Sequence, residues 1–205
     1  MKLPNPFAYP MQPHIRRHGP QGYSDPREYR NWLRDEFAFR CVYCLRRETW
    51  WTMPRDFQVE HILPESKRKD LRLEYDNLCF ACTECNGTKG VQIIPAPDSV
   101  AYGECLMVDA NGIIHARDGS PKGAEIIEAL DLNARKYVRM RCQILITIAE
   151  SDPGTRTMKR CLGYPDLDDL PDLSKEREPK LNKRPKGIRE SHFARKQRDD
   201  LPEYY

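Results

Sequence analysis

Two Cys-x-x-Cys pairs give the strongest chemical signal in this sequence of 205 residues. They are Cys41 with Cys44 and Cys82 with Cys85. A turn of this spacing presents two thiolates to one ion, so two turns can complete a closed tetrahedral Zn²⁺ site of the structural kind. Buried thiols or a disulfide pair are the alternative. The remaining cysteines show no such pairing and are expected to be core residues, with the role of the nearby Cys79 left open: Cys79, Cys105, Cys142 and Cys161.

Between the two cysteine pairs, Glu60 and His61 follow each other in an extended, β-prone run that Pro64 stops. Neighbours on a strand point to opposite faces, but at a strand end both can still border one site. A carboxylate is a natural ligand for Mg²⁺, and a neutral imidazole is a natural general base for activating water. Taken alone, His61 could equally be a structural histidine or a further zinc ligand.

Three polar residues follow at positions that matter for the same site. Asn86 comes directly after a zinc ligand in a predicted short helix that Gly90 ends, so its amide oxygen can reach an ion held by Glu60. Lys89 could hold a phosphate as a point charge, or only complement the helix dipole. Asn77 precedes the second cysteine pair.

In order, C-x-x-C, Glu-His-Ile-x-Pro, Asn-Leu and C-x-x-C-Asn-x-x-Lys resemble the HNH (ββα-metal) endonucleases, in the variant held together by two C-x-x-C pairs. The resemblance covers about residues 41–90, and the lead-in from residue 18 is similar to stand-alone bacterial HNH proteins. It implies that Glu60 and Asn86 hold one divalent cation, Mg²⁺ or Mn²⁺ or another, that His61 deprotonates water, and that Asn77 organises the loop carrying His61. Glu60 stands where Asp or His is common, and Asn86 replaces the last His, which leaves the metal preference open.

The expected activity is therefore metal-dependent hydrolysis of phosphodiester bonds in nucleic acid, with DNA the first expectation and one strand cut per active site. The alternative is a zinc-containing nucleic-acid- or protein-binding module that has no cleavage activity. A third possibility is an effector of a bacterial defence or mobile-element system, which would act with a protein partner such as an ATPase.

Basic residues near this segment are candidates for phosphate contacts. Four lie in the loop between His61 and Asn77, two in the N-terminal arm, and one is the helix lysine: Lys67, Arg68, Lys69, Arg72, Arg16, Arg17 and Lys89. The alternative for such charges is a solvated surface, or for the arm, packing on the core. Trp50 and Trp51 could stack on a base, but covering the core is the expected role.

The elements that must position these residues indicate an α+β fold in four regions. Residues 1–24 are expected to be an extended arm rich in proline and glycine, and residues 25–94 the HNH core with a preceding helix that Asp25 caps. Residues 95–164 should form a hairpin around Asn111-Gly112 and two helices near 122–131 and 134–149, as support or a docking surface. Residues 165–205 should be an acidic linker and a basic tail, both poorly ordered.

Composition adds little on function. The formal net charge is only +3 although 32% of the residues are charged. The net charge therefore does not by itself indicate that the protein binds nucleic acid. No run of 18 apolar residues and no signal peptide are visible, so we expect a cytoplasmic chain without a membrane segment. A cytoplasmic setting again favours zinc thiolates over disulfides.

Overall fold

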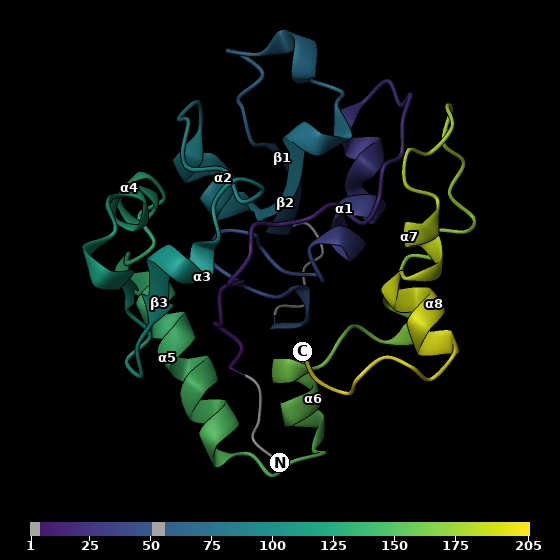
Figure 1. Cartoon of the computed structure of the whole chain (residues 1–205). Coiled ribbons are helices and arrows are strands. Elements are labelled where there is room, and N and C mark those ends of the chain that lie inside the picture. Colours follow the sequence, from purple (N-terminus) through teal and green to yellow (C-terminus); the bar gives the residue numbers. More distant parts are fainter. Residues whose placement is uncertain (1–4, 51–55) are drawn as a thin grey trace.

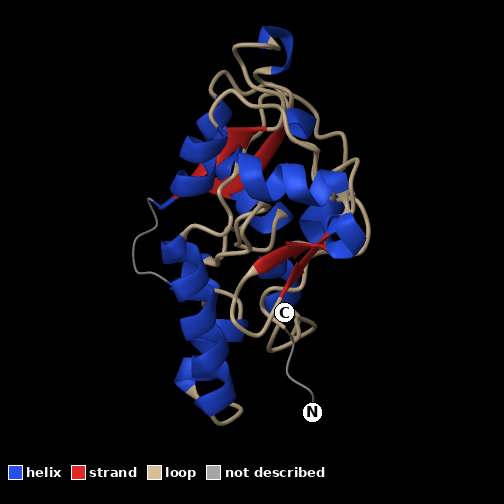
Figure 2. Cartoon of the chain, turned by 90° about the vertical axis from the view of Figure 1, so that its left-hand side faces the viewer, coloured by secondary structure: helices blue, strands red, loops and turns tan. Residues whose placement is uncertain are grey.

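The computed structural model describes residues 5–50 and 56–205, so the expectation for Trp51 lies outside the described residues. The fold is α+β, as predicted, with two small antiparallel sheets among short helices (Figures 1 and 2). In the described ranges no helix combines the length and apolar character needed to cross a membrane. Short 3₁₀ segments join the larger elements: η1 (Pro26–Tyr29), η2 (Glu48–Trp50), η4 (Lys69–Leu71), η5 (Tyr75–Asn77), η6 (Arg117–Gly119) and η7 (Leu167–Asp169).

The centre of the molecule is a strand–strand–helix unit. Strand β1 (Phe57–His61) pairs antiparallel with β2 (Leu78–Cys82), and helix α2 (Thr83–Lys89) follows β2 directly. The Cys82 sulfur accepts a hydrogen bond from the amide of Cys85 and so caps the helix, which ends at Gly90 with φ +51°. This left-handed backbone suits glycine, and it confirms the predicted end of the helix.

Helix α1 (Arg30–Glu36) supports this sheet from the side. Asp25 caps this segment as predicted and forms a capping box with Glu28, although the first turn, η1, is 3₁₀. The apolar side chains of this helical segment are buried: Tyr29, Trp32, Leu33 and Phe37. Trp50 is also buried, and its indole nitrogen donates to the Cys161 carbonyl at 3.0 Å, so it covers the core.

The second sheet and its helices follow the core. Helix α3 (Tyr102–Cys105) precedes strand β3 (Leu106–Val108), which pairs with β4 (Ile114–Ala116). Each strand of this hairpin has only three residues, and the residues before β3 are helical. Gly112 turns the hairpin at φ +77°, and a side chain there would meet the backbone of α5. Three helices complete the region: α4 (Pro121–Ala129), α5 (Arg135–Glu150) and α6 (Arg156–Leu162).

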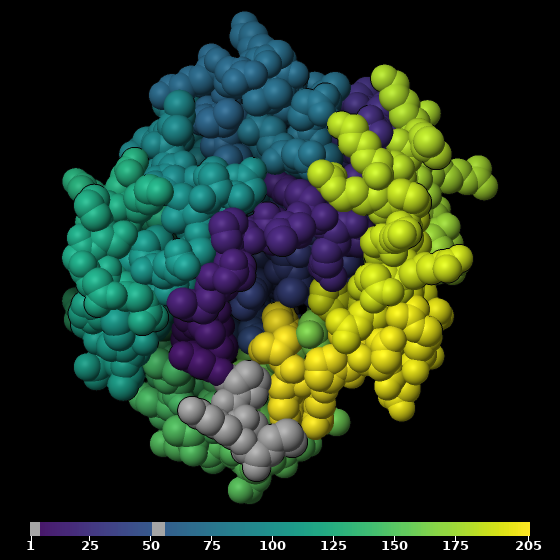
Figure 3. Space-filling view, in the orientation of Figure 1, coloured from purple at the N-terminus to yellow at the C-terminus, as the bar shows by residue number. Residues whose placement is uncertain are grey.

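The expectation of a poorly ordered tail differs from the structure. The tail contains helices α7 (Lys186–Arg189) and α8 (His192–Gln197), and Leu170, Leu173 and His192 are buried. In Figure 3 the tail (yellow) lies beside the N-terminal arm (purple). Both segments bind the same buried carboxylate, because the imidazoles of His18 and His192 bond to Asp35 at 2.7 and 2.9 Å. The prediction from composition was wrong for this tail. A few buried apolar residues and the contact with Asp35 hold the charged segment against the core.

The neighbouring carboxylate of Glu36 predicts how the fold responds to acid. Burial alone would raise the pKa of Glu36, but the hydrogen bond from His14, the charge of His18 and the amide of Arg17 lower it to about 2, below its ordinary 4.5. The hydroxyl of Tyr75 also donates to this carboxylate. A lowered pKa stabilises the fold above about pH 4.5, and this contribution is lost as the pH falls towards 2.

We therefore expect the free energy of unfolding to fall by about 3 kcal/mol from Glu36 alone across that window. Urea unfolding at a series of acid pH values, followed by tryptophan fluorescence, measures this dependence. The Glu36→Gln variant should be less stable at neutral pH and should show a flatter acid dependence. Parallel pH profiles for the variant and the natural protein would contradict this.

Candidate active site

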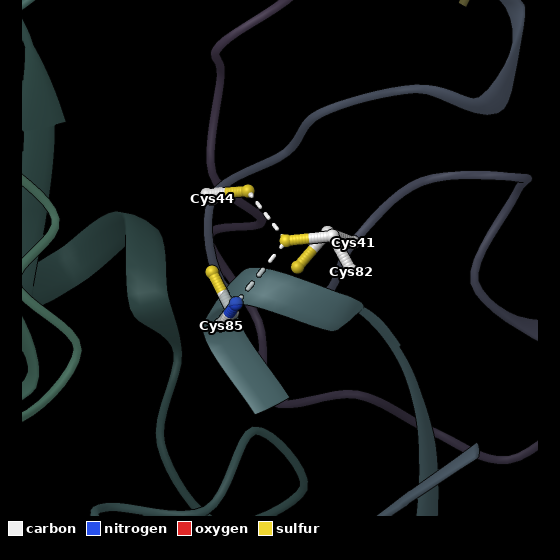
Figure 4. Close-up of side chains that lie close together, drawn as sticks. All are labelled: Cys41, Cys44, Cys82 and Cys85. Carbon is white, nitrogen blue, oxygen red and sulfur yellow. Dashed lines mark hydrogen bonds between the residues drawn. The ribbon is translucent and has the colours of Figure 1, made fainter. Parts of the chain in front are cut away.

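The four predicted zinc ligands come together at one point. The Sγ atoms of Cys41, Cys44, Cys82 and Cys85 lie within 4.8 Å of one another, and all four residues are buried (Figure 4). The Sγ atoms of Cys44 and Cys82 are 3.7 Å apart. A tetrahedral zinc site with Zn–S bonds of about 2.3 Å has edges of about 3.8 Å. In the described part of the chain, this is the one group of three or more His, Cys, Asp or Glu residues arranged to hold a metal.

The ionisation of these thiols also fits a cation. Burial opposes ionisation, but hydrogen bonds from the other three thiols hold the pKa of Cys41 well below its usual range. Hydrogen bonds with Cys41 and Cys82, together with burial, raise the pKa of Cys44 and of Cys85. Four thiols this close cannot all ionise by themselves, so the cluster favours one thiolate until a divalent cation binds. The donor set and the spacing therefore fit a structural Zn²⁺.

Cys79 lies outside this cluster. Its sulfur is 3.6 Å from the hydroxyl of Tyr43, and burial raises its pKa to about 12, so it stays a thiol. The doubt that the sequence left about Cys79 is resolved in favour of a core residue.

Glu60 and His61 occupy opposite faces of β1, as expected for neighbours on a strand. Glu60 is buried at 6% exposure and faces α2, where the ammonium of Lys89 lies 2.6 Å from its carboxylate. Burial raises the pKa of Glu60 in spite of this partner. The same ammonium donates to the main-chain carbonyl of His61 at 2.8 Å. Lys89 thus connects α2 to the end of β1 that carries the two residues.

Asn86 and Gln58 lie one step along the same interface. Gln58 precedes Glu60 by two residues, so both side chains share the face of β1 that α2 covers. The amide nitrogen of Asn86 donates to the Gln58 amide oxygen at 2.9 Å, and its own oxygen stays available as an acceptor. Gln58 was not predicted from the sequence, although its i, i+2 relation to Glu60 would have placed it on this face. The interface therefore gathers one carboxylate and two amide groups, which are the oxygen ligands that suit a hard divalent cation.

The half-buried imidazole of His61 points to the other side of the strand. Its Nε2 lies 3.0 Å from the main-chain carbonyl of Arg72. A carbonyl can only accept, so Nε2 carries the proton and Nδ1 holds the free lone pair. His61 is thus held in the tautomer that can accept a proton through Nδ1.

Asn77 fixes the loop that supplies this carbonyl. Its side-chain oxygen accepts from the amide of Leu63 at 2.9 Å, and its nitrogen donates to the carbonyls of Leu63 and Leu71 at 3.1 and 3.3 Å. Three hydrogen bonds from one buried amide bring both ends of the loop together next to His61. The role of Asn77 as organiser of this loop, which the resemblance implied, stays a prediction.

The basic residues divide into two groups. Lys67 and Lys69 are exposed, and Arg68 and Arg72 remain partly exposed although they pair with Asp70 and Glu65. The other three differ from expectation because they have internal partners. Lys89 is fully buried, Arg16 donates to the carbonyls of Asp76 and Leu78, and Arg17 binds Asp35. These three side chains attach secondary structure and the N-terminal arm to the core, so they are not free for phosphate contacts.

Strands β1 and β2, with Glu60 and His61 at the end of β1, are followed by α2 in the ββα arrangement that the resemblance implies, and Cys82 of β2 and Cys85 of α2 supply two of the four thiols. The model of the HNH endonuclease family matches residues 41–92, which contain every element of this unit. The match spans about a quarter of the chain. It supports a nuclease class of function and an association with nucleic acid. No curated protein was found to match the chain.

Proposed function

We propose that this protein is a metal-dependent endonuclease that hydrolyses phosphodiester bonds in DNA, with His61 as the general base. The observation that carries the proposal is the hydrogen bond from Nε2 of His61 to the Arg72 carbonyl, because it leaves Nδ1 free to accept a proton. The loop held by Asn77 supplies the carbonyl that fixes this tautomer, and it leaves the imidazole half-exposed. This arrangement supports a role in proton transfer more than a role in core packing.

In the proposed reaction, His61 takes a proton from water onto Nδ1 while the water oxygen attacks phosphorus and the bond to the 3′-oxygen breaks. Glu60 and Asn86 would hold a divalent cation, for which Mg²⁺ is the first candidate; when bound it supplies charge neutralisation to the phosphate and the leaving oxygen. Lys67 and Lys69 lie on the exposed loop that follows β1 and would attract the phosphate backbone.

The test is an assay with supercoiled plasmid and with oligonucleotides of DNA and RNA, in Mg²⁺ or Mn²⁺ and in chelator. We expect nicked circles to appear before linear DNA because one site cuts one strand at a time. Cleavage of RNA alone would overturn the assignment of DNA as substrate. Cleavage that persists in chelator would overturn the metal dependence.

Two observations favour the alternative of a binding module without cleavage activity. The Lys89 ammonium already neutralises Glu60, the carboxylate proposed as a ligand. The imidazole of His61 lies on the face of β1 opposite to Glu60 and Asn86, so the proposed reaction requires a phosphate bound across the end of this strand. If the protein shifts nucleic acid in gels but cuts nothing with any divalent metal, this alternative holds. Action with a protein partner such as an ATPase, within a bacterial defence or mobile-element system, stays a prediction.

The pairing of Lys89 with Glu60 predicts a measurable competition with the cation. In Lys89→Met the buried Glu60 carboxylate loses its partner, so the free energy of unfolding should fall by about 3–5 kcal/mol. Mn²⁺ should then raise the melting temperature of the variant more than that of the natural protein, because a bound cation replaces the missing ammonium.

Lys67→Met is the matched control because Lys67 is exposed, and its stability and response to Mn²⁺ should equal those of the natural protein. Differential scanning fluorimetry of zinc-loaded protein over a Mn²⁺ titration measures both effects. An equal Mn²⁺ response in Lys89→Met and the natural protein would count against Glu60 as a cation ligand.

A further inference from the structure

Helix α5 carries a second apolar stripe next to its core face. Tyr137 and Arg141 are buried on the core side, and Ile144 and Ile148 face the core or α6. The stripe and the hairpin residues Asn111 and Ile113 line a surface groove of about 460 Å³, and the stripe consists of Val138, Cys142 and Ile146, of which Ile146 is 43% exposed. Figure 1 shows α5 running along the lower left edge of the molecule. A helix that only supported the core would need one apolar face, so this stripe calls for a partner.

The charges at the ends of this stripe oppose the dipole of their own helix. Arg135 begins α5 and Arg139 follows one turn later, whereas Glu150 ends the helix. Cations at a helix N-terminus and an anion at its C-terminus are each unfavourable. In the described part of the chain none of the three side chains forms an ion pair. The helix itself therefore does not account for this arrangement of charge.

We propose that a second copy of this chain docks on the groove, with the two α5 helices antiparallel and a two-fold axis next to Cys142. In that register Val138 lies opposite Ile146 of the second copy, and Arg135 lies within one residue of Glu150 of the second copy. The apolar residues of the two copies then face each other, and Arg135 of each copy pairs with Glu150 of the other. A two-fold interface requires such self-complementarity, since the same patch serves on both copies.

A second copy explains the symmetry of this pattern about Cys142 better than an unrelated partner does. A single helix pair about 24 Å long lies near the small end of specific interfaces, about 1,200 Å² in total, so we expect a dissociation constant in the micromolar range. The inference goes beyond the proposed function, and its test measures association without cleavage. If both hold, one particle contains two sites and can cut both strands.

Sedimentation velocity over the micromolar range tests association. We expect a concentration-dependent dimer whose dissociation constant rises at least about tenfold in Ile146→Glu, since a charge would be buried in the seam. Leu181→Glu is the control, because Leu181 is 88% exposed in the tail and lies outside the groove. Circular dichroism and zinc content verify that each variant is folded.

Two further experiments test the register. Arg135→Glu should weaken the dimer, and combining it with Glu150→Arg should restore it. A short bismaleimide should link two chains through Cys142, and Cys142→Ser should abolish the link, because the other seven cysteines are buried. A monomer at all concentrations, a dimer indifferent to Ile146→Glu, or a charge reversal that does not restore association would each overturn the proposal. If the protein is a monomer at all concentrations, the groove does not bind a second copy, and a different protein becomes the candidate partner.

Discussion

Replacing His61 by alanine is expected to lower the rate of phosphodiester cleavage by about 10²–10⁴-fold, which is the usual contribution of a general base. In the proposed mechanism Nδ1 of His61 accepts the proton of the attacking water, and the variant lacks this atom. The measurement is the initial rate of plasmid nicking in Mn²⁺ with protein verified for zinc content.

His115→Ala is the matched control for this substitution. His115 is also on a strand and also partly exposed, but its imidazole bonds to Asp109 in the second sheet. It should nick at the natural rate. Nicking by His61→Ala within about twofold of the natural rate would remove His61 from the mechanism. Loss of zinc from His61→Ala would instead make it a metal ligand.

Replacing Cys82 by serine is expected to have the largest effect on stability. Structural zinc sites bind with apparent free energies of about 10–16 kcal/mol, which is as large as the whole stability of a typical domain. Cys82 also caps α2, so its loss affects both the metal site and the helix that carries Asn86. We expect Cys82→Ser to lose zinc and to unfold the segment around residues 41–92.

Cys79→Ala provides the control on the same strand. Its sulfur contacts Tyr43 and not the cluster, so this variant should keep one zinc ion and lose only about 1–2 kcal/mol of stability. Elemental analysis and thermal unfolding separate the two variants. A Cys82→Ser protein that melts at the natural temperature without zinc would show that the cluster is not a structural metal site.

The sequence was sufficient for the ββα unit because its signals are local. The spacing of the cysteines, the run before Pro64 and the glycine at position 90 each depend on a few neighbouring residues. The same holds for the capping box at Asp25 and for the turn at Gly112. These short-range rules placed the zinc cluster and the first and second helices close to where they lie.

Short-range sequence patterns could not predict the partners of the charged side chains. Lys89 resembles any lysine at the end of a helix, and only the packing of α2 on β1 directs its ammonium to buried Glu60. The tail was misjudged for a related reason. Its composition is that of a solvated segment, while one of the contacts that hold it is with Asp35, which lies 157 residues before His192. Contacts over such separations depend on the whole fold.

Asp35 also couples segments that are far apart along the chain. Its carboxylate accepts from His18 in the arm and from His192 in the tail, and α1, which carries it, packs against β1 and β2. Contacts of such long sequence separation form slowly, because a large loop must close before they are made. We therefore expect α1 and the sheet beside it to reach full stability only after residue 192 has folded back onto Asp35.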